Sequence, residues 1–283
     1  MDVKIARSFL FVPGNRQSRF QKAVDAGADA VIVDLEDAVA PQCKDNARAE
    51  LSAWVREDQP VLVRINGATT EWFERDLELA ALPGISGVVI PKVEDSEQIR
   101  LARSVVPQGK NIFPIIESAR GFANVRSVAT ADGVTRLMFG ALDLQADLGL
   151  SGQNEELHYF MSQLVLESRV ANLPGPIDSI TAELRDARVL SFDSARARRF
   201  GFRGKFCIHP NQIAIVNGAF NYSETETDWA ARVIAADMEA DGAAIAVDGR
   251  MVDAPVIVRA REILEFSAQV SAEAQSRFAH EKR

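Results

Sequence analysis

The chain has 283 residues, of which 47% are hydrophobic and 25% charged, the mix of a folded globular protein long enough to bury a large core. Its 32 basic and 40 acidic residues give a net charge of −8, which disfavours a nucleic-acid partner because such binding depends on neutralising phosphates. Two cysteines and three histidines disfavour a disulfide framework and a zinc site, and no run approaches the ~18 apolar residues of a membrane span, so we expect a cytoplasmic protein without a membrane partner.

Eight short apolar runs recur along the chain, each followed by a polar break and a segment with helical spacing. Because the runs are continuous rather than alternating, they predict strands buried on both faces, as in a parallel sheet. This order predicts an α/β fold, the (β/α)8 TIM barrel, with a doubly wound open sheet as the alternative. The open sheet is disfavoured because the chain has no glycine-rich phosphate turn. The runs are Ser8–Val12, Ala30–Leu35, Val61–Ile65, Gly87–Ile90, Ile112–Ile116, Arg136–Phe139, Gly175–Ile177 and Gly204–Ile208.

The pattern changes after about residue 220. Thr225–Asp241 predicts a long amphipathic helix and Val256–Val270 a second one, followed by a polar tail that we expect to fray. This is more chain than eight βα units need. We therefore predict a barrel domain over residues 1–220 and a C-terminal lid and oligomerisation segment over residues 221–283.

Charged side chains follow most of the predicted strands, and in such a barrel the chemistry gathers at the carboxyl ends of the strands. Glu117 and Asp143 follow two neighbouring strands and can face one point. Such a pair suits Mg²⁺, which takes one or two protein carboxylates and completes its coordination with water and substrate oxygens. The alternative is that each carboxylate caps the helix after it.

Two basic residues follow other strands. The Arg64 guanidinium suits a bidentate grip on a carboxylate, with an ion pair to Glu36 or Asp37 as the alternative. Lys92 could form a Schiff base with a carbonyl substrate, but a rim lysine paired with one of the many acids is favoured. A hydrolase of the Ser-His-Asp type is disfavoured because the chain has no GxSxG motif.

Nine motifs carry a resemblance that runs nearly from end to end. They are RSFLFVPGNR (7–16), VIVDLEDAV (31–39), VRIN (63–66), VIPKVE (89–94), PIIESARG (114–121), FGALDLQADLG (139–149), GPID (175–178), GKFCIHPNQ (204–212) and GRMVDAPVIVRAREIL (249–264). In this order they resemble the citrate lyase beta subunit-like (CitE-like) proteins of the HpcH/HpaI aldolase superfamily.

The resemblance implies a carbon–carbon lyase that depends on Mg²⁺, or on Mn²⁺ as an alternative ion. Its substrate would be a 3-hydroxyacyl-CoA such as malyl-, citramalyl- or citryl-CoA, cleaved to acetyl-CoA and a 2-oxo acid or formed from them. The resemblance makes Glu117 and Asp143 the metal ligands, with Glu117 also beside the substrate. It makes Arg64 the residue that holds the carboxylate of the 2-oxo acid. The remaining acids and base near these ligands would form a second layer, comprising Glu36, Asp37 and Lys92.

The resemblance also implies a CoA contact, an acid/base residue and an assembly. The turn near the CoA comprises Pro13, Gly14, Asn15 and Arg16. Asp253 matches an acid/base residue that relatives offer from the lid of a neighbouring subunit, in a homotrimer or hexamer. The other interpretation of Asp253 is a cap on the helix that begins near Pro255.

Other functions stay open on this scaffold. A malyl-CoA thioesterase or a malate synthase could use the same site, and a true citrate lyase beta subunit would act with an acyl-carrier subunit instead of free CoA. A catalytically silent subunit is disfavoured because Arg64, Glu117, Asp143 and Asp253 are all present. A CoA-independent class II aldolase usually needs a histidine base, and only His209 is expected near the rim.

Overall fold

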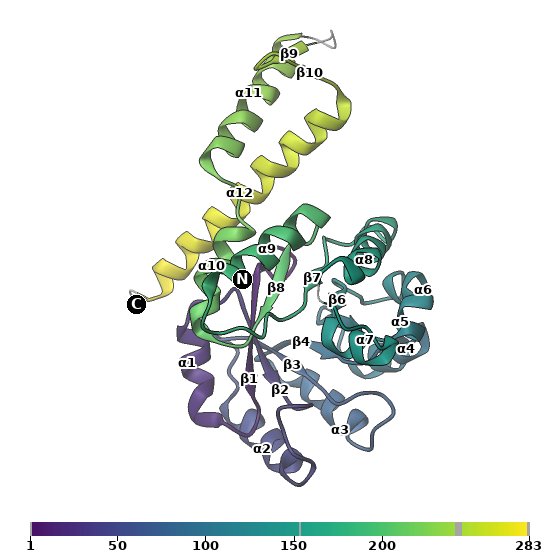
Figure 1. Ribbon diagram of the computed structural model, residues 1–283. Coiled ribbons are helices and arrows are strands. Elements are labelled where there is room, and N and C mark those ends of the chain that lie inside the picture. The colour runs from purple at the N-terminus through teal and green to yellow at the C-terminus, as the bar shows by residue number, and fades with distance from the viewer. Residues whose placement is uncertain (1, 153, 241–244, 282–283) are drawn as a thin grey trace. The chain divides into compact units, whose positions relative to one another are not determined.

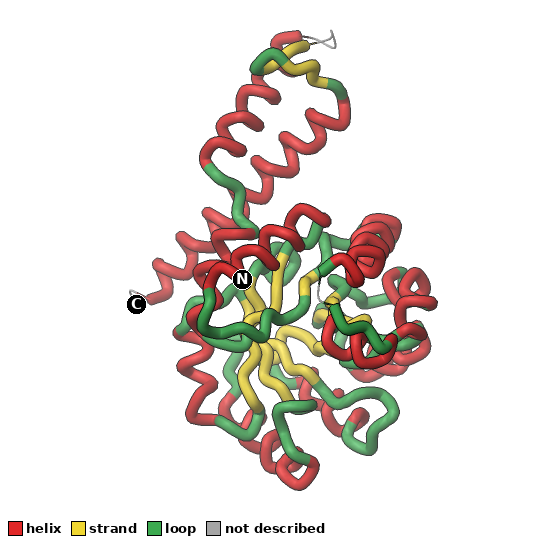
Figure 2. The backbone as a smooth tube through the Cα atoms, viewed as in Figure 1, coloured by secondary structure: helices red, strands yellow, loops and turns green. Residues whose placement is uncertain are grey.

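The computed structural model describes residues 2–152, 154–240 and 245–281. The chain divides into two compact units, one made of Ala6–Phe220 and the other of Met1–Ile5 with Asn221–Arg283. In the first unit eight parallel strands close into a barrel in chain order (Figures 1 and 2). The predicted TIM barrel is confirmed. The strands are β1 (Ser8–Pro13), β2 (Ala30–Asp34), β3 (Val61–Arg64), β4 (Ile85–Ile90), β5 (Asn111–Ile116), β6 (Met138–Phe139), β7 (Ile177–Asp178) and β8 (Gly204–Cys207).

The strands of the barrel are buried on both faces, as in a parallel sheet. All five residues of β2 are buried, as are all four of β8, so neither strand has a face exposed to water. Helices surround the barrel and shield the outer face of the strands (Figure 2). They are α1 (Phe20–Asp25), α2 (Lys44–Trp54), α3 (Phe73–Leu77), α4 (Ser96–Val105), α5 (Ala119–Ala123), α6 (Val125–Ala129), α7 (Ala141–Leu148), α8 (His158–Val170), α9 (Ala187–Phe200) and α10 (Ile213–Ala219), with 3₁₀ turns η1 (Gln17–Arg19), η2 (Pro41–Cys43), η3 (Glu78–Ala81), η4 (Glu155–Leu157) and η5 (Pro210–Gln212).

Local signals decide where several of these helices begin and end. The Asp95 side chain accepts a hydrogen bond from the Gln98 backbone N–H, and the Gln98 side chain returns one, which is a capping box at the start of α4. Gly201 ends α9 in the left-handed region, at φ 105°. These boundaries set the lengths of the loops that leave the carboxyl ends of the strands.

The second unit contains two helices and a hairpin. These are α11 (Glu224–Ala240), β9 (Ile245–Val247), β10 (Arg250–Val252) and α12 (Ala254–Glu281). One sequence prediction is wrong here, because the tail expected to fray after Val270 continues as helix to Glu281. The stretch between the helices, for which the sequence predicted no structure, forms an antiparallel hairpin. Residues 2–5, assigned to the barrel from sequence, group with this unit, where the Asp2 N–H donates to the Glu273 carboxylate at 3.1 Å.

No helix in the described ranges is both long and apolar enough to cross a membrane.

Candidate active site at the carboxyl end of the barrel

A cavity of about 430 Å³ lies among the carboxyl ends of the strands. Polar groups from four elements line it: Asp34 ends β2, Arg64 ends β3, Glu117 follows β5, and Asp143 lies in the first turn of α7. Aromatic side chains from β1 and β8 complete the wall. The fold therefore brings together the three barrel residues predicted to carry the chemistry, together with Asp34, which the sequence did not single out.

Glu117 is an acid placed where a negative charge is costly. It is 5% exposed, and its pKa is raised to about 8 by burial and by the nearby charges of Asp143 and Glu36. The backbone N–H of Lys92 donates to its Oε1 at 2.6 Å. Gly140 leaves room for the carboxylate, since a Cβ at that position would lie 2.1 Å from Oε2 of Glu117. A cation at this point would relieve the repulsion between the two acids.

The predicted alternative, that these acids cap helices, is wrong. Ser118 caps α5 by accepting a hydrogen bond from the Gly121 N–H at 3.1 Å, and Asp143 lies inside α7, whose N-cap is Gly140. In the part of the chain that the structure describes, no cluster of three or more His, Cys, Asp or Glu side chains could hold a metal ion. Two carboxylates are nevertheless the number that Mg²⁺ commonly takes from a protein, so Glu117 and Asp143 fit this ion.

Arg64 is held mainly by Asp34. Its Nε and Nη2 each lie 2.7 Å from an oxygen of the Asp34 carboxylate, which also accepts hydrogen bonds from the backbone N–H groups of Glu36 and Ala38, at 2.9 and 3.1 Å. The pair forms because Asp34 and Arg64 are register partners on adjacent strands. The ion pair predicted with Glu36 is also present, at 3.1 Å from Nη1. The Nε and Nη2 edge of the guanidinium is therefore occupied by the Asp34 carboxylate.

The surroundings of Arg64 keep it charged. Its Cζ lies 4.7 Å from the centroid of the Phe11 ring, and 15% of the side chain is exposed. Burial alone would lower the pKa of Arg64, but the hydrogen bonds and charge of Asp34 raise it above its ordinary value. The N–H groups that Asp34 does not use remain near the cavity and can meet an anionic ligand.

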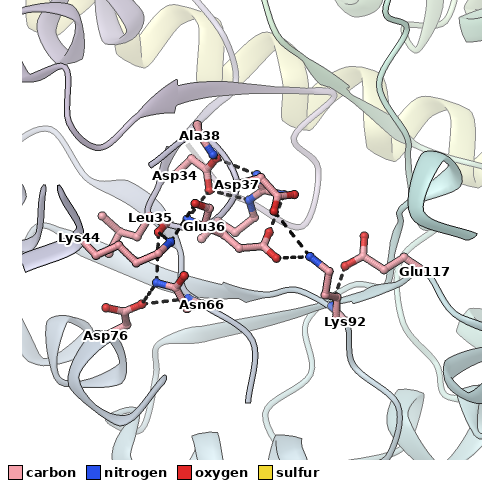
Figure 3. Close-up of polar contacts among 11 residues, drawn as sticks. Asp34, Leu35, Glu36, Asp37, Ala38, Lys44, Asn66, Asp76, Lys92 and Glu117 are labelled. Atoms are coloured by element: carbon pink, nitrogen blue, oxygen red, sulfur yellow. Dashed lines mark hydrogen bonds and ion pairs between the residues drawn. The ribbon is translucent and has the colours of Figure 1, made fainter. Parts of the chain in front are cut away.

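Lys92 forms the ion pair that the sequence favoured. Its Nζ bonds to Oε1 of Glu36 and lies 3.7 Å from Oδ1 of Asp37 (Figure 3). Burial alone would lower the pKa of Lys92, but the hydrogen bond to Glu36 and the charges of Asp37 and Glu117 raise it. A lysine that stays protonated is a poor nucleophile, so this geometry disfavours the Schiff-base alternative.

A cluster of Lys44, Asn66 and Asp76, which the sequence analysis did not identify, supports the loop after β2 (Figure 3). The buried Lys44 ammonium donates to the backbone carbonyls of Leu35 and Glu36 at 2.8 and 3.0 Å. Asn66 donates to the same Leu35 carbonyl at 3.1 Å and to the Asp76 carboxylate at 2.6 Å. These bonds fix the backbone from which Asp34, Glu36 and Asp37 project.

The predicted CoA turn lies at the rim. Pro13 ends β1 and lines the cavity, and the Gly14 N–H donates to the Asp34 carbonyl at 2.8 Å. Only glycine fits there, since a Cβ would lie 2.7 Å from the Leu35 side chain. Asn15 is half-buried and Arg16 is exposed.

Asp253 lies in the other compact unit. Its side chain is exposed, and it precedes α12. The Val256 N–H donates to the Asp253 carbonyl at 3.0 Å and reaches the Asp253 carboxylate at 3.4 Å. The capping interpretation is therefore correct locally, and it is compatible with a role for the free carboxylate oxygen.

Comparison with known proteins identifies the family. The family model described as HpcH/HpaI aldolase/citrate lyase matches residues 7–210. The chain belongs to this family. The resemblance to this family is thereby confirmed.

Relatives in this family carry different activities in their names. A citrate lyase subunit beta-like protein of Mycobacterium tuberculosis is 33% identical over 271 residues, covering 94% of this chain and 97% of the relative. A (3S)-malyl-CoA thioesterase of Cereibacter sphaeroides is 33% identical over 275 residues, covering 94% of this chain and 96% of the relative. Among solved structures, CitE of M. tuberculosis in complex with magnesium, acetoacetate and coenzyme A superposes with a TM-score of 0.81 at 32% identity, covering 94% of this chain and all of that one. The family is therefore lyase- and aldolase-like, and it includes relatives named as thioesterases.

Proposed function

We propose that this protein is a Mg²⁺-dependent carbon–carbon lyase that cleaves or forms a 3-hydroxyacyl-CoA such as malyl-, citramalyl- or citryl-CoA. The products of cleavage are acetyl-CoA and a 2-oxo acid. The observation that carries this proposal is the buried Glu117 carboxyl, which faces the same cavity as Asp143 and Arg64. The magnesium, acetoacetate and coenzyme A bound by the M. tuberculosis relative support the same ligand chemistry.

Each residue has a role that its surroundings allow. Glu117 and Asp143 hold the divalent cation, Mg²⁺ or Mn²⁺, which when bound supplies Lewis-acid polarisation of the keto oxygen of the 2-oxo acid. Arg64 binds and orients the carboxylate of the 2-oxo acid through the N–H groups that Asp34 leaves unused. The turn that begins at Pro13 contacts the CoA portion.

Asp253 is the proposed acid/base. In the synthetic direction its carboxylate takes a proton from the methyl group next to the thioester, and the enolate formed attacks the keto carbon, whose oxygen then takes a proton from water to become the 3-hydroxyl group. In the cleavage direction the hydroxyl group gives its proton to water, the carbon–carbon bond breaks, and Asp253 returns a proton to the acetyl group. A positioned acid/base typically contributes ~10²–10⁴-fold to the rate. We propose that a neighbouring subunit of a homotrimer or hexamer supplies this residue.

Thioester hydrolysis is the second candidate, favoured by the similarity to the C. sphaeroides thioesterase. It would need water to attack the thioester carbonyl. A citrate lyase beta subunit of Leuconostoc mesenteroides subsp. cremoris is 30% identical over 284 residues, so action on an acyl-carrier partner is the third.

The deciding experiment is a panel of malyl-, citramalyl- and citryl-CoA with Mg²⁺. We expect acetyl-CoA and an oxo acid in equal amounts, activity lost in EDTA and restored by Mg²⁺, and no inactivation by borohydride. Glu117→Gln and Asp143→Asn are the matched controls and should be inactive. Free CoA without acetyl-CoA would instead identify a thioesterase, and turnover of an acyl-carrier thioester alone would identify the citrate lyase type. Full activity in EDTA with borohydride trapping of Lys92 would overturn the metal mechanism.

A further inference from the structure

Lys92 occupies a backbone conformation that costs free energy. It lies two residues after β4 at φ 53°, in the left-handed region, where a residue with a Cβ is roughly 1–2 kcal/mol less stable than in the right-handed one. Glycine would adopt this conformation without the penalty. The chain nevertheless has a lysine here, so the side chain must contribute something that glycine would not.

Lys92 contacts two carboxylates of the site, those of Glu117 and Glu36 (Figure 3). Its backbone N–H donates to Oε1 of Glu117 at 2.6 Å, and the left-handed turn directs that N–H to the carboxylate. Its ammonium bonds to Oε1 of Glu36, which follows β2 on the other side of β3. The side chain is about half exposed, so its geometry depends on these partners more than on packing.

Glu36 lies between Lys92 and Arg64. Its Oε2 is buried, accepts no hydrogen bond, and lies 3.1 Å from Nη1 of Arg64. Asp34 already occupies the Nε and Nη2 atoms of Arg64. If Oε1 of Glu36 were released from Lys92, both oxygens of Glu36 could turn onto Nη1 and would compete more strongly with a carboxylate ligand for the remaining edge of the guanidinium.

We propose that Lys92 is a positioning residue that binds Oε1 of Glu36 and so limits Glu36 to the single ion-pair contact of Oε2 with Arg64, while the Lys92 backbone orients Glu117. The proposal rests on the proposed function, because it assigns Arg64 to the oxo acid and Glu117 to the cation. Lys92 touches neither ligand and acts through the two carboxylates.

The test is Lys92→Gly, which removes the ammonium but keeps the backbone N–H and relieves the left-handed strain. Binding of Mn²⁺ and then of pyruvate to the Mn²⁺-loaded protein is measured by calorimetry. The pyruvate Kd should rise about tenfold or more, because Glu36 would then compete for one hydrogen bond between Arg64 and the pyruvate carboxylate. Such a rise is the usual effect of losing one charge-assisted hydrogen bond. The Kd for Mn²⁺ should stay the same or fall, because a nearby positive charge is gone and the bond to Glu117 is kept. Lys92→Arg should restore most of the pyruvate affinity.

A double variant separates positioning from a general structural effect. In the Glu36→Gln background the competing negative charge is absent, so Lys92→Gly should change the pyruvate Kd little. Asn172, at φ 56° after α8, provides the strain control. Asn172→Gly should leave both dissociation constants unchanged, and its melting temperature shows what release from the left-handed region alone does to stability.

Three results would overturn the inference: a wild-type pyruvate Kd in Lys92→Gly, a parallel weakening of Mn²⁺ and pyruvate binding, or an equal effect of Lys92→Gly in both backgrounds. Failure of the proposed function looks different. If the wild-type chain binds Mn²⁺ and pyruvate but cleaves no acyl-CoA, only the proposed reaction falls. If the wild-type chain binds no pyruvate, both proposals fall.

Discussion

At the residue scale, Glu117 links the stability of the fold to the chemistry of the site. Its pKa is raised to about 8 from an ordinary value of 4.5, first by burial and then by the charges of Asp143 and Glu36. Between these two values the folded state holds a proton that the unfolded chain has released. The free energy of unfolding therefore falls as the pH rises from about 4.5 to about 8, by about 1.4 kcal/mol for each unit of pKa shift. A cation bound to Glu117 would offset this loss of stability.

Glu117→Gln should remove this pH dependence, because glutamine keeps the shape and can still accept the Lys92 N–H. In EDTA the variant should match the wild type near pH 4.5 and become the more stable of the two by pH 8, as measured by urea unfolding. Saturating Mn²⁺ should then stabilise the wild type but not the variant. Asp143→Asn is the partner control and should weaken the pH dependence by lowering the pKa of Glu117. Equal pH dependence in wild type and Glu117→Gln would contradict the assignment.

At the element scale, the β9–β10 hairpin determines how the chain reaches Asp253. Asp248 and Gly249 form its two-residue turn at φ 53° and 74°, and the turn sets the pairing of Arg250 with Val247. Strand β10 ends at Val252, directly before Asp253. Val252 and Val247 pack into the apolar core of this unit, so the turn fixes the register that buries them.

Gly249→Ala should weaken the hairpin and lower turnover while leaving 2-oxo acid binding in the barrel unchanged. Apart from the adjacent residues in the chain, no heavy atom of the described residues lies within 4 Å of the added methyl group, so the cost is backbone strain, roughly 1–2 kcal/mol. Hydrogen exchange of the β10 amides and steady-state kinetics measure the two effects. Gly27→Ala carries the same strain in the barrel, at φ 80° with equally open space, and should leave β10 exchange unchanged. Faster β10 exchange in both variants would contradict a local effect.

At the scale of the whole molecule, the candidate residues are divided between two compact units. The cavity with Arg64, Glu117 and Asp143 belongs to the barrel, and Asp253 belongs to the C-terminal unit. The barrel can therefore bind ligands while the acid/base comes from elsewhere, which in our proposal is a neighbouring subunit. A catalytic role for the Asp253 of a neighbouring subunit requires that the protein form an oligomer in solution.

Mixing two inactive variants tests this arrangement. Asp253→Asn keeps a good helix cap but loses the proton acceptor, so turnover should fall ~10²–10⁴-fold while Mn²⁺ and pyruvate binding persist. Arg64→Ala should lose 2-oxo acid binding. After subunit exchange, hybrids that pair an intact barrel with an intact Asp253 should recover part of the activity. No recovery under proven exchange would mean that Asp253 acts in its own chain or has no catalytic role.

The sequence alone determined the barrel and most of its rim. Continuous apolar runs such as Ala30–Leu35 predicted buried parallel strands, because burial on both faces leaves no polar alternation. A parallel barrel brings every carboxyl strand end to one rim, so the positions of Arg64, Glu117 and Asp143 after their strands were enough to predict that they lie together. The hairpin escaped prediction because each of its strands has three residues, too short to show a period.

Only the tertiary structure decided how the rim residues pair. Asp34 rather than Asp37 became the main partner of Arg64, because strand register puts Asp34 opposite it. The bond from the Lys92 backbone to Glu117 depends on a left-handed φ that residue type does not encode. Sequence patterns record which side chains are buried and how often they repeat, whereas register and backbone angles at strand ends result from the free energy of packing the whole barrel.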